Sequence, residues 1–361
     1  MNLDHLRGTK VVMAMSGGVD SSLAAAILQQ AGVEVIGVFM HVWDYSGQER
    51  SSPGSCCSTE DAYDARKVAG KLGIPFYSVD MRDTFRRDVI DPFIGAYEAG
   101  RTPNPCANCN RLVKFGALLD IARQLQTEYI ATGHYVQRQD DENGVRLFRG
   151  SDHTKDQSYF LATISRQQAG HIFFPVGHLD KNETRKLAAK FDLPTASKQE
   201  SQDICFIPAG DRLAFLQRQG STAGFRSGDI VDRSGKVLGQ HKGIANFTIG
   251  QRKGLGLSDG PWNIVSMDRK NARVVVDRPS LALVNGVHVE QFNWIHQPDN
   301  ASDISIKVRY RAPSVACKLK FKSGQVTAIF NEQQSTTAPG QVAAFYAGEE
   351  LLGGGEIKGL F

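Results

Sequence analysis

The sequence predicts an α/β protein: a doubly wound, mostly parallel sheet, then a small mixed central domain, then a carboxy-terminal β-barrel. Strand-like and helix-like segments alternate up to His134, which is the rhythm of parallel βαβ units. From Gly228 onward short runs separated by turn residues predict hairpins, and alternating apolar and polar residues after 285 predict a small barrel. We expect domain boundaries at 1–208, 209–283 and 284–361.

The first part of the chain carries the alternating elements in order. Ser58, followed by Glu60 and Asp61, predicts the start of the second helix, because a serine cap and early acidic residues both favour a helix amino terminus. Strands are expected over 11–15, 33–40, 75–79 and 129–133, with helices over 21–30, 58–72, 84–98 and 112–125.

The later part of the chain carries shorter elements. A hairpin is expected from 229–231 with 237–238, and another from 264–267 with 273–276. The barrel strands are expected at 287–289, 304–310, 315–321, 326–330 and 342–346.

Size and composition describe a globular protein. The 361 residues suffice for two or three domains, and 41% hydrophobic with 22% charged residues is an ordinary balance. Apolar runs are too short to cross a membrane, and the first strand begins near residue 10, so neither a membrane partner nor a targeting peptide is expected. A cytoplasmic location follows as the expectation. The net charge of +4 permits a nucleic-acid partner without requiring one.

The first strong motif is Ser-Gly-Gly-Val-Asp-Ser-Ser at 16–22, between a predicted buried strand and a predicted helix. Glycines let the backbone approach an anion, and the free N–H groups at a helix start attract phosphate. The segment lacks the Gly-Lys-Ser/Thr of ordinary P-loops. Because ligands in such sheets lie beyond the carboxyl ends of the strands, we expect this loop, Met40 and 133–134 to border one crevice. The alternative is an ordinary capped strand-to-helix turn.

The second motif is Thr-Pro-Asn-Pro-Cys-Ala-Asn-Cys-Asn at 102–110. Its prolines and asparagines predict a stiff exposed loop before the helix at 112, with Cys109 at the helix start. Nearby cations and the helix start both favour a thiolate. Cys205 is a candidate partner thiol, because sulfur transfer often needs a second thiol to resolve a mixed disulfide. The remaining cysteines are weaker candidates for reactive thiols. Cys56 and Cys57 are expected in a mobile loop or just before a helix, and Cys317 in a strand, either in the core or at the surface.

Taken in order, the motifs of this chain resemble those of the bacterial tRNA-specific 2-thiouridylases, a family of PP-loop ATP pyrophosphatases with a Rossmann-like sheet. The resemblance runs from about residue 10 to the carboxyl terminus. The matching blocks are Ser-Gly-Gly-Val-Asp-Ser-Ser at 16–22, Cys-Ser-x-Glu-Asp-x-x-Asp-Ala-Arg at 57–66, Thr-Pro-Asn-Pro at 102–105, Ala-Thr-Gly-His-Tyr at 131–135, Lys-Asp-Gln-Ser-Tyr-Phe at 155–160, Ser-Gln-Asp-Ile-Cys-Phe at 201–206 and Leu-Gly-Gly-Gly at 352–355.

The resemblance implies an ATP-dependent sulfurtransferase that makes 2-thiouridine at the wobble position of tRNAs for lysine, glutamate and glutamine. ATP adenylates the C2 oxygen, pyrophosphate leaves, and a persulfide supplies sulfur. The implied partners are the tRNA anticodon stem-loop and a cysteine desulfurase or sulfur-carrier protein. The central domain would contact tRNA.

Carried over by position, the resemblance also implies site residues. Cys205 would carry the persulfide, and Cys109 would attack it, leaving a Cys109–Cys205 disulfide. Asp20 is a candidate Mg²⁺ ligand. The residues implied for ATP are Ala14, Met15, Ser16, Gly17, Gly18, Val19, Asp20, Ser21, Met40 and Gly133; those for the target base are Asn104, Pro105 and Cys106; those for the rest of the tRNA are His134, Lys155, Asp156, Gln157, Arg309, Tyr310 and Gln341.

Several alternatives stay open. Residues 155–158 also fit a helix cap, and 309–311 a solvated strand face. Many members of the family carry aspartate where this chain has Cys106, so Cys106, Cys109 and Cys205 could instead hold an iron–sulfur cluster. The chain could also be an amide-forming PP-loop synthetase, or a tRNA-binding protein with a disused nucleotide loop.

Overall fold

In the computed structural model of the protein, residues 4–43, 58–142, 144–200, 204–207, 211–298, 303–322 and 324–361 are described. They divide between two compact units. Unit 1 comprises Met1–Val89, Cys106–Gly210 and Glu349–Leu351, and unit 2 comprises Ile90–Pro105, Asp211–Gly348 and Leu352–Phe361. None of the helices in these ranges is both long and apolar enough to cross a membrane.

Unit 1 is built on a five-stranded sheet in the order β3-β2-β1-β4-β7, with every pair parallel. This confirms the predicted doubly wound sheet. The chain adds strands on one side of β1 first and then on the other, so the switch point lies between β1 and β4. The strands are β1 (Lys10–Ala14), β2 (Glu34–His41), β3 (Phe76–Asp80), β4 (Ile130–Ala131) and β7 (Ile172–Phe173).

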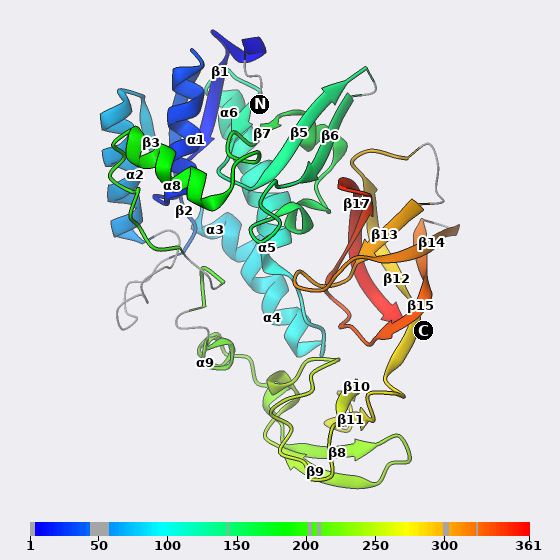
Figure 1. Ribbon diagram of the computed structural model, residues 1–361. Coiled ribbons are helices and arrows are strands. Elements are labelled where there is room, and N and C mark those ends of the chain that lie inside the picture. Colours follow the sequence, from blue (N-terminus) through cyan, green and yellow to red (C-terminus); the bar gives the residue numbers. More distant parts are fainter. Residues whose placement is uncertain are drawn as a thin grey trace. The chain divides into compact units, whose positions relative to one another are not determined.

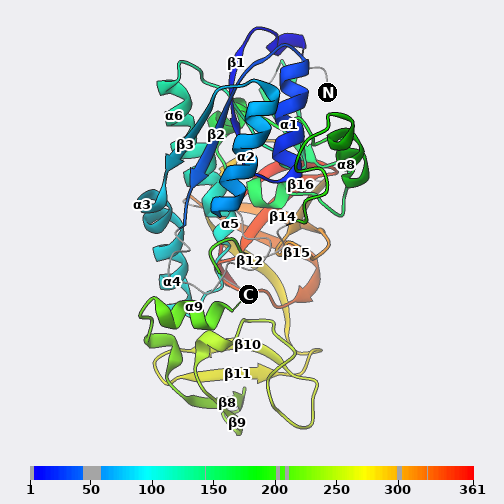
Figure 2. The ribbon, with the colours of Figure 1, turned by 90° about the vertical axis from the view of Figure 1, so that its left-hand side faces the viewer.

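Helices α1 and α2 lie side by side over this sheet (Figure 2). Ser58 caps α2 through a full capping box with Asp61, which confirms the predicted helix start. The apolar residues of β1 and α1 are fully buried and make the centre of the unit 1 core. The helices of unit 1 are α1 (Val19–Gln30), α2 (Thr59–Leu72), α3 (Arg82–Phe85), α6 (Leu118–Gln124), α7 (Arg166–Gly170) and α8 (Lys181–Lys190).

Some predicted segments differ from the structure. The strand expected over 304–310 ends at Lys307, so residues 308–310 lie outside it. The helix expected over 84–98 is divided into α3, a π-helix at Arg86–Ile90 and α4 (Asp91–Glu98). The loop expected over 102–110 is wrong: α5 (Pro105–Asn108) runs directly into the π-helix η3 (Cys109–Ala117). A proline is tolerated in the first turn of a helix, where its missing N–H has no intrahelical partner to bond. Cys109 therefore lies one turn inside a helix rather than before it.

Unit 1 also contains a hairpin that the sequence did not predict, β5 (Val136–Asp141) and β6 (Gly144–Arg149). The last strand, β17 (Glu350–Leu360), begins in unit 1, where Glu350 and Leu351 pair with Phe148 and Leu147 of β6. Arg146 adds an ion pair to Glu350.

Unit 2 contains a mixed four-stranded sheet and a closed barrel (Figure 1). The sheet has the order β10-β11-β8-β9, so both predicted hairpins are present. The barrel runs β12-β15-β14-β13-β16-β17 and closes through β12–β17, which confirms the predicted barrel. The strands are β8 (Gly228–Asp232), β9 (Val237–His241), β10 (Asn263–Asp268), β11 (Arg273–Asp277), β12 (Leu283–Trp294), β13 (Ile304–Lys307), β14 (Val315–Lys322), β15 (Gln325–Ser335) and β16 (Val342–Ala347).

Helix α4 belongs to unit 2, although its residues fall between elements of unit 1 in the sequence. Phe93 and Tyr97 of α4 are buried, and they pack against Phe215 and Arg212 of α9 (Arg212–Arg218). The core of unit 2 thus includes a helix that the sequence analysis placed with the parallel sheet.

Candidate active site

The 16–22 loop joins β1 to α1 at the centre of the sheet. Gly18 is the residue before the helix, with an extended backbone and no side-chain cap, so the first N–H groups of α1 remain open to an anion. Ser21 and Ser22 are buried, and both hydroxyls donate to the Gly18 carbonyl, at 3.1 and 2.8 Å. These two hydroxyls therefore help to fix the shape of the loop.

Two glycines allow neighbouring elements to close around this loop. Gly17 has a left-handed φ of +73°, and a Cβ there would lie 2.2 Å from the Asp61 carbonyl oxygen in α2. At Gly133, just after β4, a Cβ would lie 2.6 Å from the Ser21 backbone nitrogen. Both glycines thus let backbone segments pack closely around the loop, which lies at the switch point of the sheet, where ligands of such folds bind.

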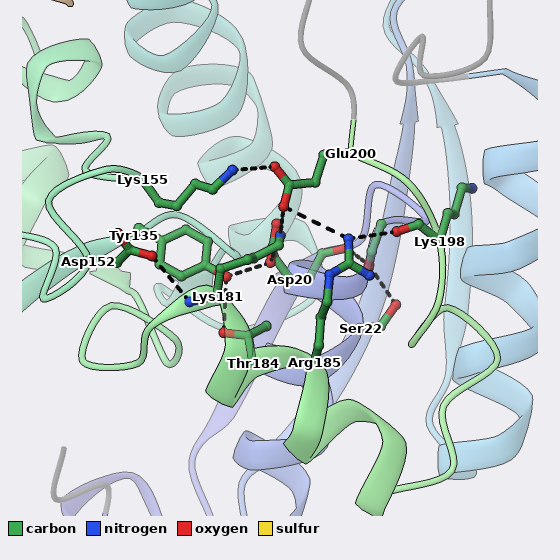
Figure 3. A network of polar contacts seen from close by, with 12 residues as sticks. Asp20, Ser22, Tyr135, Asp152, Lys155, Lys181, Thr184, Arg185, Lys198 and Glu200 are labelled. Atoms are coloured by element: carbon green, nitrogen blue, oxygen red, sulfur yellow. Dashed lines mark hydrogen bonds and ion pairs between the residues drawn. The ribbon is translucent and has the colours of Figure 1, made fainter.

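Asp20, in the first turn of α1, is the acidic residue of the loop (Figure 3). Its Oδ1 accepts hydrogen bonds from the Tyr135 hydroxyl and the Lys181 ammonium, both at 2.7 Å. Burial and the adjacent carboxylate raise the pKa of Tyr135, so this hydroxyl stays protonated as a donor. Tyr135 and Lys181 could not be predicted as partners of Asp20, because each lies more than a hundred residues from it along the chain.

The Asp20 carboxylate is suited to hold Mg²⁺. Both donors bind Oδ1, and Oδ2 has no hydrogen-bond partner among the described residues. Mg²⁺ in nucleotide sites takes one or two carboxylates together with phosphate oxygens and water. Asp20 therefore fits the ligand role that the sequence suggested, with Tyr135 and Lys181 fixing its orientation.

Glu200 lies beside Asp20 and is surrounded by cations. Lys155 is 2.6 Å away, Lys181 3.0 Å and Arg185 3.9 Å. Burial alone would raise the pKa of Glu200, but hydrogen bonds from Lys155 and Lys181 outweigh it and lower the pKa. Lys155, expected to meet tRNA, is thus part of an ion-pair network next to the loop.

Lys198 ties the same stretch of chain to α2. Its ammonium lies 2.7 Å from Asp61 and 2.6 Å from Asp64. Burial opposes its charge, but the two carboxylates raise its pKa. Asp61 also caps α2 and borders Gly17, so this ion pair supports one wall of the loop.

Other predicted residues near the loop have internal partners. Asp156 is buried and accepts hydrogen bonds from the Ser158 and Gly150 backbones, and the Gln157 side chain accepts from the Tyr135 backbone. The Asp156 carboxylate thus bonds the first N–H of the 3₁₀ helix Ser158–Leu161, whereas the Gln157 side chain makes no helix cap. Met40 is half-buried near the end of β2.

His134, directly after Gly133, is partly buried and bonds through Nδ1 to the Thr132 hydroxyl at 2.7 Å. Burial, with a smaller effect from Lys114, holds the pKa of His134 well below its ordinary value. The ring is therefore neutral at physiological pH.

The thiols lie on separate elements of unit 1. Cys106 is exposed in α5, Cys109 is half-buried as the first residue of η3, and Cys205 is half-buried in a turn. Phe206, next to Cys205, is buried against Trp43 and against Phe85 of α3. Helix α3 contacts η3, so the neighbour of Cys205 packs on an element that touches the helix of Cys109.

The iron–sulfur alternative is not favoured by this geometry. Within the described ranges, which include Cys106, Cys109 and Cys205, no three His, Cys, Asp or Glu side chains come together to hold a metal ion. Cys56, Cys57 and the Ser201–Asp203 part of one family block lie outside the described residues. Cys317 is buried in the barrel, and burial raises its pKa to about 12.

The chain is similar to known protein families over most of its length. The family descriptions that match are "tRNA methyl transferase HUP domain" over 9–209, "tRNA methyl transferase PRC-barrel domain" over 214–278 and "Aminomethyltransferase beta-barrel domain" over 284–357. A tRNA-specific 2-thiouridylase MnmA from Magnetococcus marinus is 44% identical over 353 residues, 96% of this chain and 98% of that protein. The MnmA of Paramagnetospirillum magneticum is 45% identical over 357 residues, 97% and 95% of the two chains. This chain belongs to the tRNA-specific 2-thiouridylase family.

Among solved structures, a 4-thiouridine synthetase in complex with RNA and ATP covers 58% of this 2-thiouridylase family member and 50% of its own chain. The TM-score is 0.35 and the identity 16%, which is too low to carry an argument about chemistry.

The remaining residues that the sequence analysis assigned to tRNA lie in unit 2 of this 2-thiouridylase family member. The Gln341 amide donates to the Thr102 carbonyl at 2.8 Å and so holds the backbone that leads into Asn104 and Pro105. The Arg309 guanidinium donates to the Thr336 carbonyl at 2.7 Å. Tyr310 lies beside Lys307, whose ammonium is 5.4 Å from the ring centre. Gln341 and Arg309 thus support backbone segments of unit 2 through their side chains.

Proposed function

We propose that this protein is an ATP-dependent tRNA 2-thiouridylase that replaces the C2 oxygen of the wobble uridine with sulfur. The observation that carries the proposal is the uncapped start of α1, closed in by Gly17 and Gly133, in a chain of the 2-thiouridylase family that also carries Cys109 and Cys205. A site for the phosphates of ATP would allow the C2 oxygen to be activated by adenylation. The two thiols would supply the sulfur that replaces this oxygen.

In the first step the uridine C2 oxygen attacks the α-phosphorus of ATP. The bond between the α-phosphorus and its bridging oxygen breaks, and pyrophosphate leaves with the electron pair. The N–H groups of α1 would hold phosphate oxygens, and Asp20, oriented by Lys181 and Tyr135, would hold Mg²⁺ against the leaving diphosphate. Ala14 to Ser21, Met40 and Gly133 are proposed to line the nucleotide.

In the second step sulfur displaces AMP. The Cys109 thiolate attacks the Cys205 sulfur of a Cys205 persulfide, and the outer sulfur leaves as hydrosulfide. That sulfur attacks C2, the C2–O bond breaks, and AMP leaves. A Cys109–Cys205 disulfide remains, and an external dithiol must supply two electrons to reopen it. The terminal persulfide sulfur is delivered by a donor protein such as a cysteine desulfurase or sulfur carrier.

The tRNA partner would enter through its anticodon stem-loop, whose unpaired bases can be turned out at low energetic cost. Asn104, Pro105 and Cys106 are proposed to border the target base, and His134, Lys155 and the 309–310 pair to lie along the RNA. A cytoplasmic location remains a prediction from the sequence.

The test is thiolation in vitro. Purified protein, unmodified tRNA, ATP, Mg²⁺ and a persulfide donor should yield tRNA that is retarded in a gel containing a mercury-bearing acrylamide. Nucleoside mass analysis separates oxygen-to-sulfur exchange from methylation, which changes the mass by a different amount. A competent tRNA that releases no pyrophosphate and gains no sulfur would contradict the proposal. ATP-dependent amide formation that survives C109S and C205S, with no thiolation of tRNA by the wild-type protein, would favour amide-forming synthetase chemistry.

A further inference from the structure

Glu200 is the carboxylate of the network in Figure 3 that has three cations within 4 Å. Lys155, Lys181 and Arg185 surround it, and they come from two different parts of the chain. Its side chain is about one-quarter exposed (24%), so these pairs are partly shielded from water. Several charges that form one network contribute more than an isolated surface ion pair does.

Lys181 connects Glu200 with the nucleotide loop. Its side chain is 11% exposed, and its ammonium lies 2.7 Å from Asp20 Oδ1 and 3.0 Å from Glu200 Oε1. One lysine therefore contacts both the residue proposed to bind Mg²⁺ and the stretch of chain that leads to Cys205. Arg185, one turn later on α8, donates to the Ala196 and Lys198 carbonyls at 2.9 and 3.0 Å and fixes the same stretch.

Beyond Cys205 the chain is fixed by aromatic packing. Phe206 is 1% exposed, with its ring centre 5.6 Å from that of Phe85 and 6.5 Å from that of Trp43. Cys205 thus lies in the sequence between Glu200, which is held by ion pairs, and Phe206, which is held by apolar packing.

We infer that Glu200 is a positioning residue for sulfur transfer, which acts through Lys181 to join the nucleotide loop to the segment that carries Cys205. This inference rests on the proposed function. It assigns to Glu200 a role in the second step, the delivery of sulfur, rather than in the binding or cleavage of ATP.

The charges around Glu200 distinguish this role from a general structural one. Lys155, Lys181 and Arg185 exceed Glu200 and Asp20 by one positive charge. If Glu200 becomes neutral, the excess rises to two, which favours a bound triphosphate. Loss of the Glu200 charge should therefore leave ATP binding intact or tighter while sulfur transfer fails.

The experiment is E200Q in the full chain, assayed for pyrophosphate release and for thiolated tRNA in the same reaction. We expect the KM for ATP to be unchanged or lower, and pyrophosphate release to continue. Thiouridine formation should fall between about 10-fold and about 100-fold, the range expected when a reacting group is displaced by a fraction of an ångström to about 1 Å. The number of pyrophosphates released per sulfur inserted should rise accordingly.

The matched control is D192N, which removes the exposed ion pair between Lys71 and Asp192 elsewhere in unit 1. It should leave the ratio of pyrophosphate to thiouridine at the wild-type value. E200D keeps the charge on a shorter side chain and should recover part of the lost thiolation. K155M keeps the Lys181 link and should raise the ratio less than E200Q does.

Three results would overturn the inference. The first is an equal fall of pyrophosphate release and thiolation in E200Q. The second is a wild-type ratio of pyrophosphate to thiouridine in E200Q. The third is a rise of this ratio in D192N that equals the rise in E200Q. If E200Q does not fold, E200D and K155M take its place. A wild-type ratio of pyrophosphate to thiouridine in both of these variants would then overturn the inference. Wild-type protein that releases no pyrophosphate would instead contradict the proposed function, which separates the two failures.

Discussion

Gly133 lies where the end of β4 meets the first turn of α1, and only a hydrogen atom fits at its α-carbon. A methyl group there would lie 2.6 Å from the Ser21 nitrogen and 2.7 Å from the Asp20 carbonyl carbon, so loop or strand must move. The conformation of one residue thus limits the geometry of the phosphate site.

We predict that G133A weakens ATP binding by at least about tenfold, because the N–H groups of the loop are displaced. Titration calorimetry with ATP and Mg²⁺ measures the change. The control is G70A in α2, where a Cβ meets nothing within 4 Å. That variant should bind ATP normally and gain about 0.5–1 kcal/mol in free energy of unfolding. Wild-type ATP affinity in G133A would contradict the role given to this contact.

The ring of His134 should stay neutral over the pH range in which the protein works. Its pKa is lowered below the unfolded value of about 6.5, so the unfolded chain binds more protons at acid pH. Its contribution to the free energy of unfolding is complete above pH about 6.5 and falls as the pH drops toward the lowered pKa. The NMR chemical shifts of the His134 ring carbons, measured in isotopically labelled protein, should be constant between about pH 8 and about pH 6.5. A midpoint near the ordinary value, or the same acid sensitivity in H134N, would refute this.

The two cysteines proposed to react, Cys109 and Cys205, should behave differently from the buried Cys317. C109S and C205S should each abolish thiolation and keep tRNA-dependent pyrophosphate release, because the alcohol replaces only the sulfur chemistry. C317A changes a buried thiol of the barrel and should keep both activities, with a loss of stability of about 1–2 kcal/mol. Retained thiolation in either serine variant would contradict the thiol roles.

The local motif at 16–22 could be predicted from the sequence, whereas the partners of its acidic residue could not. Glycines and a helix start leave a short-range pattern. Lys181 and Tyr135 contact Asp20, and Glu200 contacts Lys181, only because the chain after β4, helix α8 and the 196–200 stretch converge there. Such contacts between distant residues leave no local pattern in a single sequence.

Helix α2 supports the loop with its amino terminus. Ser58 and Asp61 form its capping box, Lys198 binds Asp61, and Gly17 packs on the Asp61 carbonyl. A substitution in the capping box should therefore alter the position of the nucleotide loop as well as the stability of α2.

We predict that S58A lowers the free energy of unfolding by about 1 kcal/mol and weakens ATP binding severalfold. Thermal unfolding and ATP titration measure the two effects. The control is S165A, which removes the same kind of capping box from α7. It should cost similar stability and leave ATP affinity unchanged. Equal loss of ATP affinity in both variants would show that the effect is general.

At the level of elements, the regular strands and helices were predictable and the exceptions have physical reasons. The 102–110 stretch was expected to be a loop because of its prolines, yet Pro105 occupies a first-turn position that tolerates proline. Strand β17 was not expected because it contains three consecutive glycines. A Cβ at Gly353 would lie 2.2 Å from the Asn293 carbonyl oxygen in β12, so glycine is required for the strands to approach.

At the scale of the molecule, each unit is assembled from segments that are separated in the sequence. Helix α4 packs on α9, although more than a hundred residues of unit 1 lie between them in the chain. Composition and motif order indicate three successive segments, but they contain no information about which helix packs with which core.

We predict that a fragment of residues 1–208 does not fold as the full chain does. It would expose Phe93 and Tyr97, whose partners Phe215 and Arg212 are missing, and it would lack the strand that pairs with β6. Size-exclusion chromatography and thermal unfolding should show aggregation or a loss of cooperativity. A monomeric fragment with one sharp transition would contradict this reading of the units.

The pairing of β17 with β6 bears on how the chain is made in the cell. Glu350 and Leu351 complete unit 1, yet a ribosome reaches them only after it has translated the whole central sheet and most of the barrel. Until then the edge of β6 at Leu147 and Phe148 lacks this partner. The nucleotide-binding unit therefore cannot be finished early in synthesis, and a messenger truncated within the barrel yields a protein with both units incomplete.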